Sequence, residues 1–389
     1  MAKEEKKAPK LRFNGYTNDW ERKELNNILK INSGRDYKQL NSGSIPVYGT
    51  GGYMLSVNDK LSDTDAVGIG RKGTIDKPLY LKAPFWTVDT LFYCTSKESS
   101  DVKFIYLLFQ IINWKRYDES TGVPSLSKNT ISSIKTYVPK VKEQDHISKL
   151  FFSLDNTLQL HERKYEELAL IKKALLQKLF PKNDEVAPEV RYKNFNDAWE
   201  QRKLGEVGKT FTGLSGKTKE DFGHGDAHFV TYMNVYSNPI SDPNMVENVE
   251  IDTKQQEVKK GDVFFTTSSE TPEEVGMSSV WLSDAPHIYL NSFCFGFRPT
   301  VNIFHPYYLA YLLRSNNIRN KMMILAQGIS RYNISKNKVM KLNVTIPNIR
   351  EQQKIGEFFK QLDFLITLHH RKLEKLKQLK KFLLQNMFI

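Results

Sequence analysis

The residues best suited to chemistry are a glycine-rich run and a pair of histidines. The run Gly-Ile-Gly-Arg-Lys-Gly at 68–73 has the glycine spacing of a dinucleotide-binding turn. That turn requires a following helix whose N-terminus meets the pyrophosphate, whereas residues 74–78 predict a turn into another strand. His224 and His228 have the i, i+4 spacing found in zinc hydrolases. They lie in a Gly/Asp-rich segment without the glutamate that such enzymes use, so we expect both on a surface loop.

Other catalytic patterns are incomplete. Gly216-Lys217-Thr218 resembles the end of a phosphate-binding loop, but Phe211 stands where the upstream glycine is required. The sequence has no Asn/Asp-Pro-Pro-aromatic motif of an adenine methyltransferase and no convincing Ser-His-Asp or Cys-His arrangement. We therefore expect no catalytic residue, no metal site and no cofactor in this chain.

Composition predicts a folded protein of a reducing compartment. The 389 residues are 40% hydrophobic and 12% aromatic, enough for two or three domains with cores. Two distant cysteines exclude a disulfide framework. The charged N-terminus is not a signal peptide, and no apolar run approaches the ~20 residues that span a bilayer. We expect a soluble, cytoplasmic protein. The net charge of +13 allows an anionic polymer as partner.

The chain contains an internal duplication. Residues 139–180 align without gaps on 347–388, and almost half of the aligned pairs are identical, among them Glu143/Glu351 and Gln144/Gln352. A shorter repeat opens each half, with Trp20/Trp199 as one of its identical pairs. Each half is therefore a short opening motif, a divergent body and a long shared tail. The joint is expected in the polar segment 182–189.

Both tails have the heptad pattern of a coiled coil. Apolar residues recur at alternating steps of four and three, which predicts a helix with one buried seam. The predicted seam residues are Leu154, Leu158, His161, Tyr165, Leu168 and Leu175 in the first tail, and Leu362, Ile366, His369, Leu373, Leu376 and Leu383 in the second. We expect the two tails to pack antiparallel on each other as a spacer. The alternative is that each helix covers only its own domain.

The bodies have an α+β pattern. Short strand-like runs at 45–54, 65–73 and 85–94 precede a helix at 101–116, and runs at 227–236, 261–269 and 288–297 precede a helix at 305–323. Each body then contains a Gly-led loop, at 120–131 and 326–339, which includes a shared Ser-Lys-Asn. Phe85, Trp86, Phe264 and Phe265 are expected in the cores.

The opening motifs Trp-Glu-Arg-Lys-Glu-Leu (20–25) and Trp-Glu-Gln-Arg-Lys-Leu-Gly-Glu (199–206), the Glu-Gln-led helices and the duplicated layout resemble type I restriction-modification specificity subunits. The resemblance covers essentially the whole chain. It implies two target-recognition domains in a pseudo-two-fold repeat, each reading half of a split double-stranded DNA target, separated by a long antiparallel two-helix coiled-coil spacer. The expected domains are an opening segment (1–19), recognition domain 1 (20–138), spacer helix 1 (139–181), a linker with the repeated opening motif (182–198), recognition domain 2 (199–346) and spacer helix 2 (347–389).

The resemblance also implies partners. Two modification subunits would bind S-adenosylmethionine and methylate adenine, and restriction subunits would use ATP with Mg for translocation and cleavage. This chain would be non-catalytic, would bind no cofactor and would lie in the cytoplasm of a bacterium or archaeon. A rigid spacer would place the half-sites about one helical turn apart, at ~34–36 Å per turn. Because the bodies differ in sequence and length, the two half-sites should differ.

The residues expected to contact DNA are polar, basic or aromatic members of glycine-rich loops, where backbone can approach a groove. They are Tyr48, Tyr53, Arg71, Lys72, Lys77 and Ser125 in the first body, and Lys217, Thr267, Ser268, Ser330, Arg331 and Tyr332 in the second. For each, the alternative is an ordinary solvated loop residue. Two other functions stay open: a coiled-coil scaffold that joins two protein-binding modules, and an enzyme with its own methyltransferase or nuclease.

Overall fold

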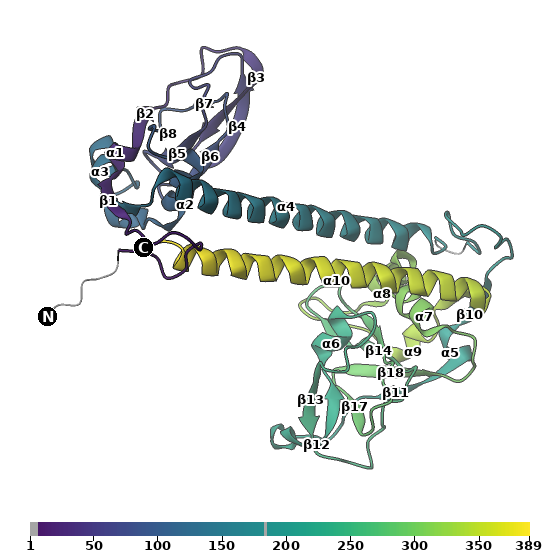
Figure 1. Cartoon of the computed structure of the whole chain (residues 1–389). Coiled ribbons are helices and arrows are strands. Elements are labelled where there is room, and N and C mark those ends of the chain that lie inside the picture. The colour runs from purple at the N-terminus through teal and green to yellow at the C-terminus, as the bar shows by residue number, and fades with distance from the viewer. Residues whose placement is uncertain (1–6, 183–184) are drawn as a thin grey trace. The chain divides into compact units, whose positions relative to one another are not determined.

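The computed structural model describes residues 7–182 and 185–389, and these form two compact units. The first unit contains the chain up to residue 162 together with 371–389, and the second contains 163–370. Parts of the predicted opening segment (1–6) and linker (183–184) lie outside the described residues. Each unit combines short strands and helices with a part of each long helix, so the predicted α+β class is confirmed (Figure 1).

The first unit contains most elements of the first body. Its strands are β1 (Glu21–Glu24), β2 (Leu29–Ser33), β3 (Ser42–Gly49), β4 (Gly52–Val57), β5 (Ala66–Gly70), β6 (Leu79–Leu81), β7 (Trp86–Thr87), β8 (Leu91–Ser96) and β9 (Lys135–Val138). Its short helices are α1 (Leu25–Ile28), α2 (Val102–Ile111), the 3-10 helix η1 (Trp114–Tyr117) and α3 (Lys128–Ser133). They form a four-stranded sheet in the order β2-β8-β5-β6, a three-stranded sheet β4-β3-β7 and the pair β1-β9.

The second unit repeats this plan with more residues. Its strands are β10 (Glu200–Lys203), β11 (Gly208–Thr212), β12 (Phe222–Val230), β13 (Val246–Val249), β14 (Val263–Thr266), β15 (Ser268–Ser269), β16 (Ser278–Val280), β17 (Ile288–Leu290), β18 (Cys294–Pro299), β19 (Tyr332–Asn333) and β20 (Asn343–Ile346). Its short helices are α5 (Leu204–Val207), η2 (Lys219–Asp221), α6 (Tyr232–Ser237), α7 (Pro306–Leu312), α8 (Asn316–Leu325) and α9 (Lys336–Val339). The sheets are β11-β18-β14-β16, β13-β12-β17, β10-β20 and β15-β19.

The repeated opening motifs close each body. β1 pairs antiparallel with β9, the strand just before the first tail, and β10 pairs in the same way with β20. The tryptophan that precedes each opening strand, Trp20 or Trp199, is buried in the core of its unit. The motif is therefore repeated because it joins the start of each body to its end, where the long helix begins.

The tails form two helices of equal length, α4 (Val141–Lys178) and α10 (Ile349–Asn386), each with 38 residues. At 1.5 Å per residue each extends ~57 Å. In the first unit Asp155 of α4 forms an ion pair with Lys380 of α10 at 2.6 Å. In the second unit Lys172 of α4 pairs with Asp363 of α10 at 2.5 Å. These are the same repeat positions with the helices exchanged, and they require antiparallel segments.

Most of the predicted seam residues pack into the apolar core of one of the two units. Leu154, Leu158, Leu376 and Leu383 join the apolar core of the first unit, and Leu168, Leu175, Leu362 and Ile366 join that of the second. Tyr165 contacts the ring of His370, with ring centroids 5.6 Å apart. Each long helix therefore packs on its own body with its first part and joins the core of the other unit with its last part. The predicted antiparallel pair of helices is confirmed, and the alternative, in which each helix covers only its own domain, is wrong.

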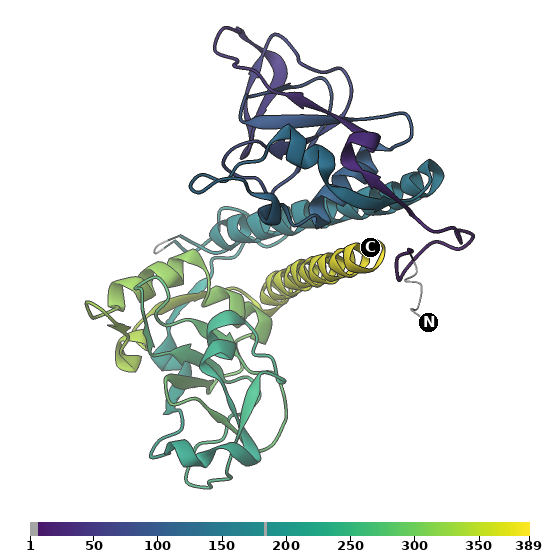
Figure 2. The same cartoon turned by 90° about the vertical axis from the view of Figure 1, so that its left-hand side faces the viewer.

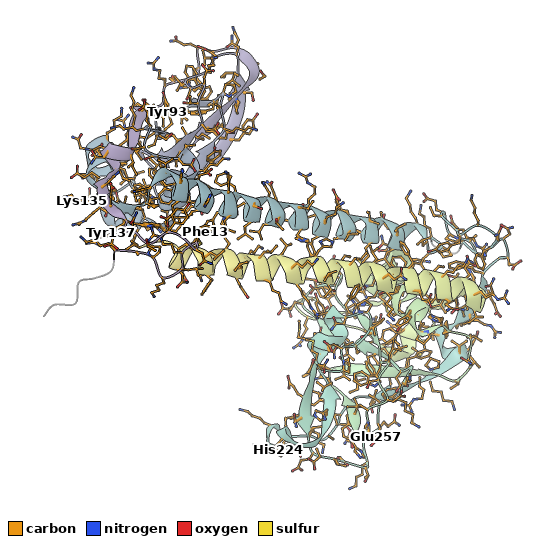
Figure 3. All side chains as sticks on the ribbon, viewed as in Figure 1. Phe13, Tyr93, Lys135, Tyr137, His224 and Glu257 are labelled. Carbon is orange, nitrogen blue, oxygen red and sulfur yellow. The ribbon has the colours of Figure 1, made fainter. Side chains whose placement is uncertain are left out.

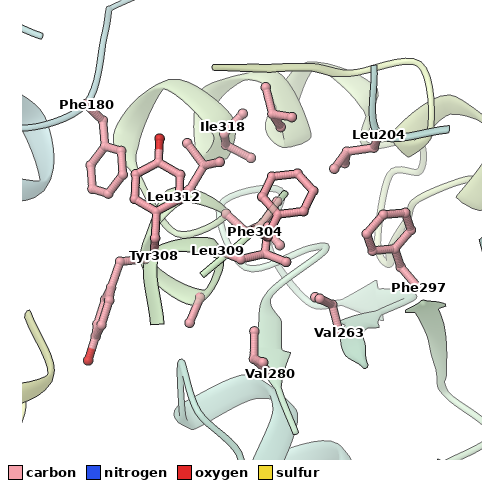
Figure 4. Close-up of a cluster of buried hydrophobic side chains, with 14 of the residues drawn as sticks. Phe180, Leu204, Val263, Val280, Phe297, Phe304, Tyr308, Leu309, Leu312 and Ile318 are labelled. Atoms are coloured by element: carbon pink, nitrogen blue, oxygen red, sulfur yellow. The ribbon is translucent and has the colours of Figure 1, made fainter. Parts of the chain in front are cut away.

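The last residues of each tail complete the other half's core. In the second unit Phe180 packs against Tyr308 and stacks on Phe359, beside the cluster of Leu309, Leu312 and Phe304 (Figure 4). In the first unit Phe388 stacks on Phe104. The start of the chain also contacts this end of α10, because the amide of Leu11 donates to the carbonyl of Asn386 at 2.8 Å. Figure 2 shows the N-terminal segment near the C-terminus.

A glutamate and a glutamine fasten each body to the start of its long helix. Arg12 donates two hydrogen bonds to Glu143, at 2.6 and 2.7 Å. The side-chain oxygen of Gln144 accepts from the amide of Asp101, which caps α2, and its nitrogen donates to the carbonyl of Pro139. Arg191, Glu351 and Gln352 form the same contacts in the second unit, where the glutamine accepts from the amide of His305 before α7.

Some predicted elements differ from the observed ones. The segment 227–236 was expected as one strand, but after β12 the chain turns at Thr231 and continues as α6, because the Thr231 hydroxyl accepts from the Asn234 amide and starts a helix. His224 and His228 lie on β12, not on a loop, and Figure 3 labels His224 at this strand. The four aromatic residues expected in the cores, Phe85, Trp86, Phe264 and Phe265, are buried. Within the described ranges no helix has the length and apolarity to cross a membrane.

Candidate functional site

In both units the Gly-led loop lies against the end of a central strand. In the first unit the loop 119–125, called the first loop, packs on the residues after β5. The amide of Gly73 donates to the carbonyl of Pro124 at 2.8 Å, and that of Leu126 donates to the carbonyl of Arg71 at 2.9 Å. Lys72 and Ser125 form a β-bridge. The backbone therefore brings together Arg71, Lys72 and Ser125, three of the predicted DNA-contacting residues.

The second unit has the same arrangement one repeat later. Here the second loop, 327–333, pairs with β15, with Ser268 opposite Asn333 and Ser269 opposite Tyr332. The amide of Ile334 donates to the carbonyl of Thr267 at 2.9 Å. These contacts correspond to those of the first loop, position by position, through the shared Ser-Lys-Asn that follows each loop. Both bodies thus use one backbone frame at this place.

A cavity of about 800 Å³ opens beside the first loop and carries mainly positive charge. Its wall includes Arg71, Lys72 and Lys128. The Arg71 guanidinium lies 5.9 Å from the centre of the Phe92 ring, and the Lys128 ammonium lies 5.8 Å from it. None of these three cations has an ion-pair partner within the part of the chain that the structure describes. The first cavity can therefore offer several hydrogen-bond donors to an electron-rich ligand.

Two acidic residues shape the first loop. Asp118 accepts from the amides of Ser125 and Ser120, at 2.9 and 3.0 Å. These backbone hydrogen bonds, that of Ser125 first, lower the pKa of Asp118. The Glu119 carboxylate accepts from the hydroxyls of Ser127 and Thr130. Both carboxylates are engaged with the loop and with α3, so they hold the cavity wall in place.

The corresponding cavity in the second unit has a volume of about 550 Å³ and a different lining. Tyr232 and Tyr236 of α6 stack with ring centroids 6.1 Å apart. The Tyr236 hydroxyl donates to Glu274 at 2.6 Å, and this hydrogen bond raises the pKa of Tyr236. Glu270, Ser330 and Arg331 complete the wall. This second cavity therefore combines carboxylate acceptors with one guanidinium donor.

Two partly buried arginines hold the wall that carries Glu274. Arg314 donates to the carbonyls of Ser278, Val235 and Tyr236. Arg319 donates to the carbonyls of Glu273, Val275 and Gly276. Burial lowers the pKa of Arg314 to about 10 and that of Arg319 to about 10. Because their acceptors are backbone carbonyls, these arginines fix the path of 273–278 and the end of α6.

The other predicted residues do not line either cavity. Tyr48 and Tyr53 face each other across the hairpin β3–β4, with ring centroids 6.4 Å apart. Lys77 is exposed between β5 and β6. Lys217 forms ion pairs with Asp252 at 3.0 Å and Asp221 at 3.9 Å, and its side chain is only 11% exposed. Its charge is therefore already neutralised, unlike that of Arg71. Thr267 and Tyr332 hold the second loop through their backbones.

Sequence reasoning missed several wall residues. Phe92 and Lys128 belong to the first cavity, and Tyr232, Tyr236 and Glu274 belong to the second. The sequence does mark Lys128, because it is the lysine of the Ser-Lys-Asn motif that both bodies share. The two tyrosines have i, i+4 spacing, but the pattern of their segment predicts a strand, in which they would face the same side without stacking. Within the residues described, no cluster of His, Cys, Asp and Glu could hold a metal ion.

Comparison with known proteins identifies the class to which these paired bodies belong. The model of the family described as type I restriction modification DNA specificity domain matches residues 17–170 and again 196–378. The chain therefore belongs to this family. The two matches follow the internal duplication, one for each body and the helix that continues from it.

Particular relatives have related names. The putative type I restriction enzyme MjaX specificity subunit of Methanocaldococcus jannaschii is 25% identical over 49% of this chain and 45% of its own length. The type I restriction enzyme MjaVIII specificity subunit of the same organism is 24% identical over 69% of this chain and 64% of its own length. The matches thus span about half to two thirds of these relatives. The crystal structure of the type I restriction-modification system S subunit from M. genitalium has the same fold, with a TM-score of 0.67, 14% identity and coverage of 98% and 99% of the two chains.

Proposed function

We propose that this chain is the non-catalytic DNA-specificity subunit of a type I restriction-modification complex. In this proposal the two cavities each read one half of a bipartite, asymmetric target. The observation that carries it is the repeated frame: the same loop closes on the same strand end in each unit, but the side chains around it differ. A common frame with unlike linings is what two unlike half-sites require.

The linings suit different base edges. Guanine presents the O6 and N7 acceptors in the major groove, which match the donors of Arg71 and Lys128 in the first cavity. Cytosine and adenine present amino groups, which match the carboxylates of Glu270 and Glu274 in the second. Arg331 adds a donor there. Basic side chains outside these contacts, such as Lys72, bind phosphates and position the protein without reading sequence.

The long helices support the proposed spacer. α4 and α10 each contribute to both units, so they join the two reading surfaces covalently. The number of unread base pairs between the half-sites is then set by these helices. The ion pairs Asp155–Lys380 and Lys172–Asp363 oppose sliding of one helix along the other.

The proposed partners supply the chemistry. Two modification subunits would bind S-adenosylmethionine and methylate adenine, and restriction subunits would use ATP with Mg in the same cytoplasmic complex. Leu379 and Phe382 are exposed on the part of α10 that belongs to the first unit. Exposed apolar side chains on a helix support a contact with another protein.

The test is single-molecule methylome sequencing of a host that expresses this chain with its modification subunits. We expect a new split motif, with two short unlike half-sites around a fixed gap and N6-methyladenine on both strands. The control is the same host with the modification subunits alone. If the complex forms but no motif appears, the function moves to a scaffold that joins two protein-binding modules.

A further inference from the structure

The second loop exposes an apolar side chain to an unusual degree. Ile329 is 96% exposed, more than any other large hydrophobic residue among those described. It lies at the outer part of the loop, two residues before Arg331, which lines the second cavity. An isoleucine left wholly in water contributes nothing to the core of its own unit, so its apolar surface is available to a ligand.

The loop that carries Ile329 is tightly closed. The amide of Gln327 donates to the carbonyl of Asn333 at 2.9 Å, and the amide of Asn333 donates back to Gln327 at 2.8 Å. Gly328 has φ +144°, and a side chain there would meet the carbonyl oxygen of Arg331 at 2.0 Å. The glycine is therefore required for the tight turn. Ile329 therefore lies on a short loop that is closed by these hydrogen bonds and that also carries Arg331 of the second cavity wall.

Two further exposed apolar side chains lie in segments that contact the second loop or the second cavity. Met233 lines the second cavity. Phe293 lies between β17 and β18, and its carbonyl accepts hydrogen bonds from both the amide and the hydroxyl of Thr267. Thr267 in turn accepts from the amide of Ile334, just after the second loop. Both loops are thus tied to one residue. The second cavity thus has a largely polar wall that includes the exposed Met233, and the exposed Ile329 and Phe293 belong to the two segments tied to Thr267.

We propose that Ile329 is a wedge that enters the base stack of the half-site read by the second body. This inference rests on the proposed function and deepens it. An apolar side chain that inserts between base steps unstacks them and kinks the duplex. The donors and acceptors of Arg331, Glu270 and Glu274 then contact the edges of the bases beside the opened step. The specificity at this half-site is therefore partly a matter of how easily its steps open.

The first loop predicts that the wedge is used on one side only. The residue in the first loop that corresponds to Ile329 is Thr121, which has a small polar side chain. Val123 is exposed there, but it occupies the position that corresponds to Arg331 and is followed by Pro124. We therefore expect distortion at the second half-site and an ordinary stack at the first.

The experiment uses the full chain assembled with its modification subunits and duplexes that carry the target found by methylome sequencing. 2-Aminopurine, whose fluorescence rises on unstacking, is placed at each position of each half-site in turn. We expect a rise of several-fold at one step of the second half-site and none in the first. Ile329→Ser should abolish that rise and weaken binding about tenfold, because the buried apolar surface is lost. Ile329→Leu should restore both.

Matched controls separate the outcomes. Ile324, on α8, is 81% exposed but outside the loop, so Ile324→Ser should leave the fluorescence and the affinity unchanged. Selective binding with the same fluorescence profile in Ile329→Ser would overturn the wedge and leave the proposed function intact. Loss of subunit assembly in Ile329→Ser, with DNA distortion preserved in the residual complex, would instead make Ile329 a protein contact. A wild-type complex that selects no sequence overturns both proposals.

Discussion

At the scale of single residues, the two cavities differ in charge although their backbones agree. Arg71 and Lys72 in the first unit correspond to Thr267 and Ser268 in the second, as the matching β-bridges require. Conversely, Val123 corresponds to Arg331. Each body therefore places its arginine on a different side of the same frame. Under the proposed function, the half-site that each body prefers would depend on these few exchanges.

The first prediction concerns these arginines. Arg71→Ala should relax the first half-site and leave the second unchanged, and Arg331→Ala should do the reverse. A lost bidentate contact costs about 1–3 kcal/mol of base discrimination. Methylome sequencing of each variant measures the change in motif. Lys217→Ala is the control, because Lys217 is paired with two aspartates and should alter neither half-site. An unchanged motif in Arg71→Ala would remove it from the reading surface.

The second prediction concerns Lys72, which has no ion-pair partner among the residues described. If Lys72 binds a phosphate, Lys72→Ala should weaken binding to all sequences alike. The slope of log affinity against log salt should become shallower by about 0.9. Binding titrations with specific and random duplexes, at salt concentrations from about 50 to about 200 mM, measure this slope. A change in motif with an unchanged slope would instead show that Lys72 reads a base.

At the scale of elements, each body depends on the buried pair that anchors it to its long helix. Glu351 is fully buried and accepts two hydrogen bonds from Arg191, and Glu143 does the same for Arg12. Removal of the glutamate leaves a partly buried guanidinium, 14% exposed in Arg12 and 15% in Arg191, without its counter-charge, which costs more than the pair itself contributes. Because the two pairs lie in different units, each should affect its own unit only.

The third prediction uses the two buried cysteines as reporters of this effect. Burial raises the pKa of Cys94 to about 12 and raises that of Cys294 too, so neither thiol reacts near pH 8 while its unit is folded. Glu351→Ala should destabilise the second unit by about 3 kcal/mol and raise the labelling rate of Cys294 roughly a hundredfold. Cys94 should label at its original rate. Glu143→Ala should show the opposite pattern.

The control for this test is an exposed pair. Glu374 and Lys377 of α10 lie 3.4 Å apart and are about half exposed. Glu374→Ala should change neither labelling rate measurably, because a surface pair contributes less than about 1 kcal/mol. Equal acceleration of both cysteines by Glu351→Ala would mean that the two units unfold together.

At the scale of the whole molecule, α4 and α10 each contribute residues to the cores of both units. Leu158 joins the core of the first unit, and Ile366, its repeat equivalent, joins that of the second. The fourth prediction is that the double change Leu158→Asp and Ile366→Asp disrupts the spacer and abolishes recognition of both half-sites together. Methylome sequencing with circular dichroism measures this. Loss of one half-site alone would show that the helices do not depend on each other.

The sequence alone determined the duplication, the two bodies, the long helices and the family, because these are written in local periodicity and in repeated words. Trp20 and Trp199, for example, are identical because they fill equivalent cores. It also found Arg71, Lys72, Ser125, Ser268, Ser330 and Arg331, which the structure gathers around two cavities, since glycine-rich loops with polar residues are visible in a sequence.

Only the tertiary structure decided the rest of each wall and the state of each charge. Phe92 and Lys128 meet Arg71 because strand pairing and loop closure bring distant segments together, and no periodicity encodes that meeting. In the sequence, Lys217 is as plausible a DNA contact as Arg71, but in the structure its charge is neutralised by an ion pair with Asp252, which is distant in the sequence. α6 replaced a predicted strand because one threonine hydroxyl capped a helix. Side-chain environments depend on packing between remote residues, whereas element type and repetition depend on near ones.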